Sequence, residues 1–137
     1  MIKIYIFILI SITSILQADS KSLYETIGKK YNIDAKVISS LAEIESKQNQ
    51  YAVGLMSKSN EHTLDAAYAL DYYHIKNSVA KNLKTIQVRS KTKKEALIAI
   101  SIAEKLGLDY DVGLMQINRR NIISLNLDIN HLLSSKT

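Results

Sequence analysis

The sequence contains no cysteine and no proline, and it has only four glycines among 137 residues. Without cysteine the chain can form neither a disulfide framework nor a thiolate metal site, so its fold must depend on apolar packing. Without proline, helices lack their strongest interruption. We therefore expect a mainly α-helical protein with at most a short β-strand or extended segment.

Long hydrophobic runs are also missing. The most apolar stretch, Ile4 to Leu16, has 13 residues, whereas a membrane-spanning helix needs roughly 18 to 20. A lysine precedes this stretch and a small residue, Ala18, follows it, which is the pattern of a secretory signal peptide. An uncleaved anchor is the alternative. We expect residues 1–18 to be a signal peptide and residues 19–137 to form one exported domain with no stable membrane span after cleavage.

The chain lacks a strong excess of one charge. Its net charge is +5, and the basic residues are spread along the sequence. A nucleic-acid-binding protein would need a basic face with interleaved aromatics and a recognisable motif, and neither is present. His62, His74 and His131 lack the close spacing of a zinc motif. We therefore expect no nucleic-acid partner, no metal and no cofactor, although a mild positive charge favours encounter with anionic polymers.

A helix is predicted after a cap at Asp34, over the sequence AKVISSLAEIESK. Its apolar face, at spacings of three and four residues, contains Val37, Ile38, Leu41, Ile44 and Glu45. Glu45 is thus an acid on the apolar side, where burial favours the neutral form of a carboxyl group. A neutral, proton-donating acid is what glycosidic bond cleavage requires. The alternative is a glutamate at the helix edge whose carboxylate reaches water.

Local signals predict the other elements. Helices are expected over residues 23–30 and after a cap at Asn60 or Thr63, and NLKTIQVRS predicts a short strand or extended segment. Thr92 and Glu95 have the spacing of a capping box, and the helix KKEALIAISIAEKL is expected to end at Gly107. DYDVGLMQIN is interpreted as a loop, in which Asp109 and Asp111 are turn formers.

Two motifs, EIESKQNQYAVG and VGLMQIN, together resemble the goose-type-lysozyme-like lytic transglycosylases of the soluble-transglycosylase superfamily. In that family a helix ends in Glu-Ser, an Asn and an Ala follow, and a Gly-Leu-Met-Gln-Ile-Asn run lines the cleft. The matching residues here are Glu45, Ser46, Asn49, Ala52 and residues 113–118. The Glu-Ser pair alone is weak evidence for this resemblance, whereas GLMQIN at this distance after it is fairly specific for the superfamily.

Within the superfamily, KKEALIAISIAEKLGLDYDVGLMQINRRN resembles the peptidoglycan hydrolase component of type IV secretion and conjugation systems. The resemblance spans residues 31–133 and implies a periplasmic, lysozyme-like helical domain whose partners are peptidoglycan glycan strands and the secretion or conjugation apparatus. This chain departs from its relatives at Gln50, where they usually have proline, and at Thr137, where it stops before their further helices. We therefore expect a domain shortened at its C-terminus, either as a short member of the family or as a truncated product.

The resemblance also implies roles for single residues. Glu45 would protonate the oxygen between N-acetylmuramic acid and N-acetylglucosamine and then act as base on the 6-hydroxyl, which gives a 1,6-anhydro end. The expected substrate contacts are Ser46, Asn49, Gly113, Leu114, Met115, Gln116 and Asn118. For Gly113 the alternative is a simple turn, and for Gln116 and Asn118 it is local backbone capping. Met115 is expected to pack beneath Glu45.

Two other functions use the same residues. One is a non-catalytic peptidoglycan-binding or assembly module that keeps the fold without turnover. The other is hydrolysis to a reducing end, as in lysozymes, which only the mass of the product distinguishes from transglycosylation.

Overall fold

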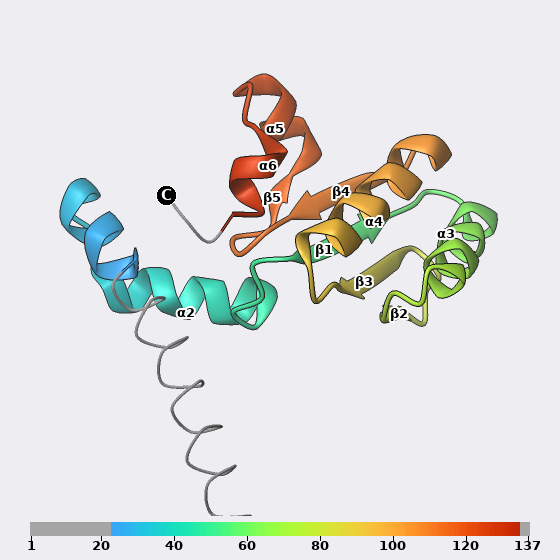
Figure 1. Ribbon diagram of the computed structural model, residues 1–137, viewed down its shortest axis with the longest axis horizontal. Helices are drawn as coiled ribbons and strands as arrows, with labels where there is room; N and C mark the ends of the chain where they lie inside the picture. The colour runs from blue at the N-terminus through green and yellow to red at the C-terminus, as the bar shows by residue number, and fades with distance from the viewer. Residues whose placement is uncertain (1–22, 135–137) are drawn as a thin grey trace, which may run out of the picture. The chain divides into compact units, whose positions relative to one another are not determined.

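The computed structural model describes residues 23–134 (Figure 1). The chain divides into two compact units, Met1–Glu43 and Ile44–Thr137. The predicted signal peptide lies outside the described residues. Within residues 23–134, no helix is both long enough and apolar enough to cross a membrane.

In the first unit, residues 23–31 are helical and α2 (Ala35–Ser46) begins after a tight turn. The backbone N–H of Lys36 donates to the Asp34 side chain at 2.8 Å, which confirms Asp34 as the cap. The turn requires glycine at position 28, because an added Cβ would lie 2.5 Å from the carbonyl oxygen of Ile33. The N–H of Ile33 in turn donates to the carbonyl of Gly28 at 2.9 Å, which closes the turn.

The predicted buried face of α2 is wrong for most of its members. Ile38 and Ala42 are buried, whereas Val37, Leu41 and Ile44 are 51%, 43% and 76% exposed. Helical periodicity predicts a broad apolar face, but the buried residues of α2 lie only along the line through positions 38 and 42. Which part of such a face is covered depends on the neighbouring elements, and helical spacing carries no information about them.

The second unit is built on a five-stranded antiparallel sheet in the order β2-β3-β1-β4-β5. The strands are β1 (Ala52–Met56), β2 (Asn77–Val79), β3 (Thr85–Arg89), β4 (Asp109–Val112) and β5 (Ile117–Asn118). The expectation of a mainly α-helical fold with at most a short strand is therefore wrong, because the protein is a mixed α and β structure. Only β3 falls in the segment that was predicted to be extended.

Helices connect and cover these strands: α3 (Asn60–Tyr72), α4 (Lys93–Leu106), α5 (Arg119–Ser124) and α6 (Ile129–Leu132). The limits predicted for α4 are confirmed. The Thr92 hydroxyl accepts from the N–H of Glu95 at 3.2 Å, and Gly107 ends the helix in the left-handed conformation, at φ 65°. For α3 the cap is Ser59 instead of Asn60 or Thr63. Its buried face contains Thr63, Ala66 and Leu70.

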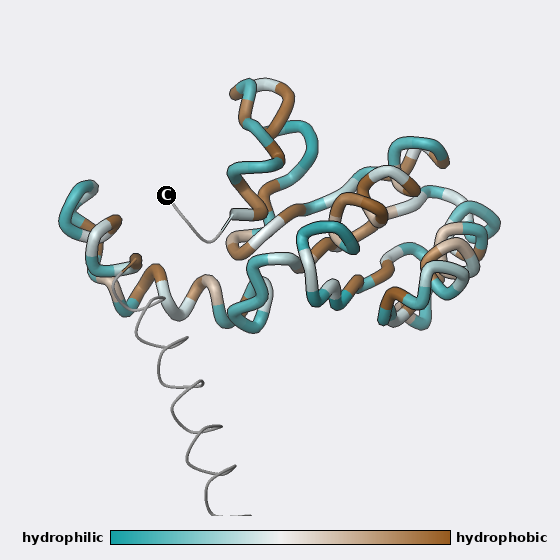
Figure 2. The backbone as a smooth tube through the Cα atoms, viewed as in Figure 1, coloured by the Kyte–Doolittle hydropathy of each residue, from teal (hydrophilic) through white to brown (hydrophobic). Residues whose placement is uncertain are grey.

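The core lies between one face of the sheet and the helices α3 and α4 (Figures 1 and 2). Alternate strand residues point into it, and those of the three central strands are Val53, Leu55, Ile86, Val88, Tyr110 and Val112. The small residues of α4, Ala96, Ala99 and Ala103, are fully buried and allow the helix to approach the sheet closely. Period-two alternation then leaves the other residues of each strand on the opposite face.

Candidate functional site

The sheet face opposite α3 and α4, here called the polar face, has a row of residues in register across all five strands. Cross-strand pairing sets Ser78 opposite Gln87, Gln87 opposite Gly54, Gly54 opposite Asp111, and Asp111 opposite Asn118. Four of these five residues are polar, and the central one has no side chain. An added Cβ at Gly54 would lie 3.2 Å from Oε1 of Gln116 and 3.9 Å from Cβ of Asp111. Glycine at the centre of the row therefore lets the Gln116 side chain lie close to the backbone of β1, beside Asp111.

Asp111 is a half-buried carboxylate held in place by the motif GLMQIN. Its Oδ1 accepts from Nδ2 of Asn118 at 2.8 Å. Burial raises the pKa of the Asp111 carboxyl above its ordinary value, the hydrogen bond from Asn118 opposes this effect, and the negative charges of Asp109 and Glu45 raise the pKa further. Glu45 is therefore close enough to Asp111 for the two carboxyl groups to interact electrostatically.

Glu45 itself is exposed, and the expectation that helix geometry turns it to the buried side is wrong. It lies one residue before the end of α2, in the same compact unit as the sheet. The next residues, Lys47 and Gln48, both have left-handed backbones, with φ values of 52° and 63°. Two consecutive non-glycine residues in this region are strained, so the chain turns sharply and at some cost directly after Glu45 and Ser46.

Asn49 fastens this turn to the sheet. Its Nδ2 donates to the carbonyl of Ser90 at 3.1 Å, and its Oδ1 accepts from the N–H of Tyr51 at 2.9 Å. The backbone N–H of Asn49 donates to the carbonyl of Ser46 at 3.1 Å. The side chain predicted to contact substrate thus links the end of α2 to the residue that follows β3, and it positions Glu45 relative to the polar face.

Gly113 begins a tight turn between β4 and β5. Its φ is 81°, and an added Cβ would lie 2.8 Å from the carbonyl oxygen of Leu132 in α6. Both the backbone conformation and the close approach of α6 therefore require glycine at this position. Of the two alternatives for Gly113, the turn is the one that the backbone adopts. Leu114 is half-buried and Met115 is 38% exposed.

The amide groups of Gln116 and Asn118 have partners within the protein. Nε2 of Gln116 donates to the carbonyls of Ala52 at 3.1 Å and Gly113 at 2.9 Å, so both of its hydrogens brace the turn. Oδ1 of Asn118 accepts from the N–H of Arg120 at 2.9 Å and caps α5. Asn118 therefore holds the Asp111 carboxylate in place, and Gln116 holds β1 against the turn.

The interpretation of Asp109 and Asp111 as turn formers in a loop is wrong, because both lie in strand β4 and project onto the polar face. The alternation of DYDV, with Tyr110 and Val112 buried, was the signal that could have identified them. Gln87 and Arg89, in the one strand that was predicted, lie on the same face and are exposed. Within residues 23–134, no group of three His, Cys, Asp or Glu residues could hold a metal ion.

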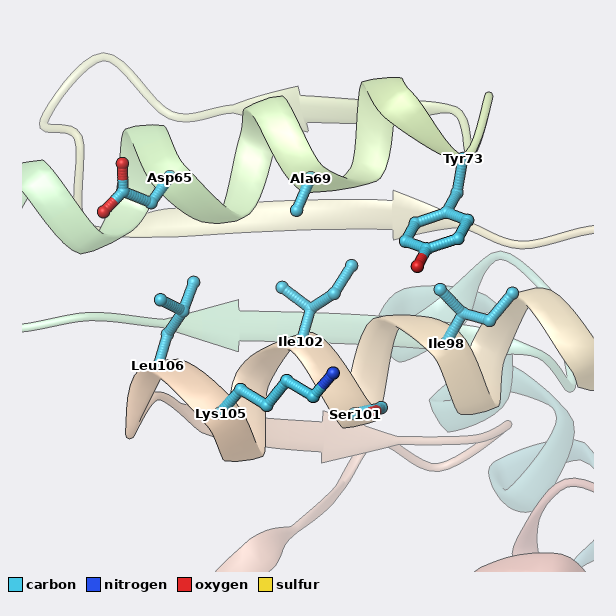
Figure 3. A pocket seen from close by; sticks show the side chains of 8 residues that line it. All are labelled: Asp65, Ala69, Tyr73, Ile98, Ser101, Ile102, Lys105 and Leu106. Atoms are coloured by element: carbon cyan, nitrogen blue, oxygen red, sulfur yellow. The ribbon is translucent and has the colours of Figure 1, made fainter.

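A cavity of about 350 Å³ lies elsewhere, between α3 and α4 on the helical side of the sheet (Figure 3). Its lining is mostly apolar and consists of Asp65, Ala69, Tyr73, Ile98, Ser101, Ile102, Lys105 and Leu106. None of the predicted site residues contributes to it. The candidate site is therefore the polar face with Glu45, and this cavity is separate from it.

The family model described as the transglycosylase SLT domain matches residues 22–136. This range covers part of the first compact unit, all but the last residue of the second, and every residue predicted for the site. No curated protein and no solved structure matches the chain.

Proposed function

The chain belongs to the transglycosylase SLT domain family, and from this premise we propose that it cleaves the β-1,4 bond between N-acetylmuramic acid and N-acetylglucosamine in peptidoglycan, with Glu45 as the catalytic acid. The observation that supports the proposal is the hydrogen bond that joins Asp111 to Asn118 of the GLMQIN motif, together with the negative charge of Glu45, which contributes to the raised pKa of Asp111. The two motifs, 68 positions apart from Glu45 to Gly113, thus meet at one face of the sheet.

In the proposed reaction the Glu45 carboxyl group gives its proton to the bridging oxygen, and the bond between that oxygen and C1 of the muramic acid breaks. Positive charge then develops on C1 and the ring oxygen. The Glu45 carboxylate takes the proton of the 6-hydroxyl, whose oxygen bonds to C1 and gives a 1,6-anhydromuramoyl end. The carboxylate of Asp111, on the sheet side, stabilises the positive charge until that bond has formed.

The other predicted contacts divide into two groups. We propose that the exposed Met115 and the half-buried Leu114 contact the sugar, since both precede the braced Gln116 in the same turn, whereas the buried Gly113 shapes that turn. Asn49, Gln116 and Asn118 have amide hydrogens bonded to protein oxygens, so we assign them to positioning. Ser46 is half-buried at the end of α2 and orients the glutamate that precedes it.

The proposed role is local opening of the peptidoglycan mesh in the periplasm during assembly of a secretion or conjugation apparatus. It follows from the resemblance of the segment from KKEAL to INRRN to the hydrolase component of type IV systems. The apparatus would then be the partner, and the glycan strand the substrate.

The test is release of 1,6-anhydromuropeptides from purified sacculi, followed by mass spectrometry. We expect release by the wild-type protein and none above background by Glu45→Gln, which keeps the shape of the side chain and removes its proton. Equal release by both proteins would remove Glu45 from its role. Products with reducing ends would indicate hydrolysis instead, and sacculus binding without any product, unchanged in Glu45→Gln, would favour the non-catalytic module.

A further inference from the structure

The polar face has two ends of opposite charge. Asp109 and Asp111 of β4 lie at one end, and the negative charge of Glu45 acts on Asp111. At the other end, Arg89 of β3 is exposed, and its alternation with the buried Val88 and Ile86 sets it on the polar face. A polymer bound across this face would therefore meet cations at one end and the catalytic carboxyl groups at the other.

Arg89 has a second cation directly opposite it. The register of β2 and β3 pairs Asn77 with Val88, and the N–H of Arg89 donates to the carbonyl of Lys76 at 2.8 Å, so the ladder continues by one residue and sets Lys76 opposite Arg89. Both side chains are exposed. Like charges directly opposite each other in an antiparallel pair destabilise the sheet.

No acidic residue of the described chain neutralises this pair. The ion pairs within residues 23–134 are those of Arg119 with Glu104 and of His131 with Asp128, and neither involves Lys76 or Arg89. A carboxylate placed between the two side chains would relieve their repulsion and accept charge-assisted hydrogen bonds from both. The arrangement therefore fits an anion that is not part of the described chain.

The position of the pair relative to Asp111 bears on which anion it would bind. Arg89 is opposite Ala52, two residues along β1 from Gly54, which is opposite Asp111. With strands about 4.8 Å apart and a rise of about 3.4 Å per residue, the Cα atoms of Arg89 and Asp111 are roughly 12 Å apart. Asn49 also bonds to Ser90, so the residue after Arg89 is tied to the turn that follows Glu45.

We propose that Lys76 and Arg89 bind the carboxylates of the peptide stems on N-acetylmuramic acid, and so select peptide-substituted glycan over bare glycan. This inference rests on the proposed function, because it places the same substrate across the same face. Muramic acid offers carboxylates from two sources, the stem peptide and, once the stem has been removed, the lactyl group. The distance of the pair from Asp111 favours the stem, which extends away from the sugar ring, whereas the lactyl group is attached to it.

The experiment compares Lys76→Gln/Arg89→Gln with the wild-type protein on two substrates: glycan strands with intact stems, and strands from which an amidase has removed them. We expect kcat/KM on stem-bearing strands to fall by about tenfold or more, mainly through KM, because the variant loses charge-assisted bonds that are formed equally in the ground and transition states. On amidase-treated strands we expect less than a twofold change.

Two controls separate recognition from structure and from net charge. Arg89→Lys keeps a cation at this position, so this variant should retain most of the preference for stem-bearing over amidase-treated strands. Lys58→Gln/Lys94→Gln removes the same charge from two other exposed positions, one in the segment after β1 and one in α4, and should leave the preference unchanged. Binding of each variant to stem-bearing strands is also measured in the Glu45→Gln background, where no turnover is needed.

The outcomes distinguish the inference from the proposed function. Cleavage of both substrates with no effect of the double substitution overturns the inference alone. An equal loss on both substrates also overturns it, because it indicates the lactyl group or a structural role. If the wild-type protein cleaves neither substrate, the proposed function fails. The inference then stands only if the double substitution weakens binding to stem-bearing strands and not to amidase-treated strands.

Discussion

Replacement of Asp111 by asparagine should reduce turnover without reducing stability. Nδ2 of Asn118 donates to Oδ1 of Asp111 at 2.8 Å in the wild-type protein. The substitution keeps an oxygen that can accept this hydrogen bond and removes the negative charge. A unit charge roughly 6 Å from the developing cation contributes about 2.8 kcal/mol at an effective dielectric of about 20, which is about a hundredfold in rate. Because Asp111 is only half-buried, solvent screens part of this interaction. We therefore expect kcat to fall by about ten- to a hundredfold.

The sign of the stability change follows from the raised pKa of Asp111, which burial causes first. A carboxyl group whose pKa is higher in the folded than in the unfolded protein stabilises the fold at low pH, and this contribution is lost as the pH rises through the folded pKa. At neutral pH the charged Asp111 therefore lowers stability, and Asp111→Asn should have an equal or higher melting temperature. A residue kept only for the fold would behave in the opposite way.

The assay is release of muropeptides from sacculi as a function of pH, with thermal unfolding measured in parallel. The acidic limb of the wild-type profile should reflect protonation of Asp111, at a pH above that of an ordinary aspartate, and Asp111→Asn should lack this limb. Asp109→Asn is the matched control, since it removes the same charge from an exposed residue of the same strand and face. Wild-type turnover in Asp111→Asn, or an equal loss in Asp109→Asn, would refute the proposed role.

Three further predictions concern the surroundings of the site. Gly113→Ala should lower the free energy of unfolding by about 2 kcal/mol or more in urea titrations, because position 113 combines a φ of 81° with a Cβ position 2.8 Å from a carbonyl of α6; an unchanged midpoint would contradict this geometry. The hydrogen bond from Arg119 holds the pKa of Glu104 below its ordinary value, so this group stabilises the fold above the ordinary glutamate pKa and the effect is lost as the pH falls through the folded pKa. Glu104→Gln should accordingly lower the melting temperature slightly at pH 7 and not in acid, whereas a constant difference would argue against the ion pair. Finally, kcat should fall steeply on short glycan fragments, because the exposed Glu45 depends on bound sugar for its dehydration, and equal kcat on long and short strands would exclude this dependence.

Elements with strong local signals were predicted from the sequence. The cap at Asp34, both ends of α4 and the extended segment at β3 depend on residues within a few positions of each other. Thr92 and Gly107, for example, satisfy the free N–H and carbonyl groups at the ends of α4 by contacts within four residues. Such signals do not depend on the rest of the fold, so the helix ends and the strand that they predict are found in the folded protein.

The sheet was missed because its strands are stabilised by distant partners. β1 has only two buried residues, Val53 and Leu55, and β4 has Tyr110 and Val112, which is too short an alternation to distinguish from a loop. Gly54 further weakens the strand signal of β1. The pairing of β1 with β3 and β4 joins residues that are at least 29 positions apart, and no local pattern records such pairing.

The motif supplied the residues of the candidate site but not their roles. Gln116 and Asn49 have amide groups suited to sugars, and only their distances to backbone carbonyls reveal that these groups brace the turn and fasten the loop. The local pattern also predicts a turn at Asp111, because loop acids before a glycine usually form turns. Its position opposite Gly54 depends on a strand pairing that the sequence pattern did not indicate.

The exposure of Glu45 changes the physical account of how it would act as an acid. Helix periodicity suggested that the protein core itself would exclude water from this carboxyl group, yet the side chain faces solvent in the free protein. In the proposed reaction this dehydration would come from the substrate, because a sugar bound beside Asp111 and against Met115 would remove water from both carboxyl groups and strengthen the charge interaction between them. If Glu45 acts in this way, glycan binding and proton transfer are coupled, and contacts far from the scissile bond would contribute to the rate of the chemical step.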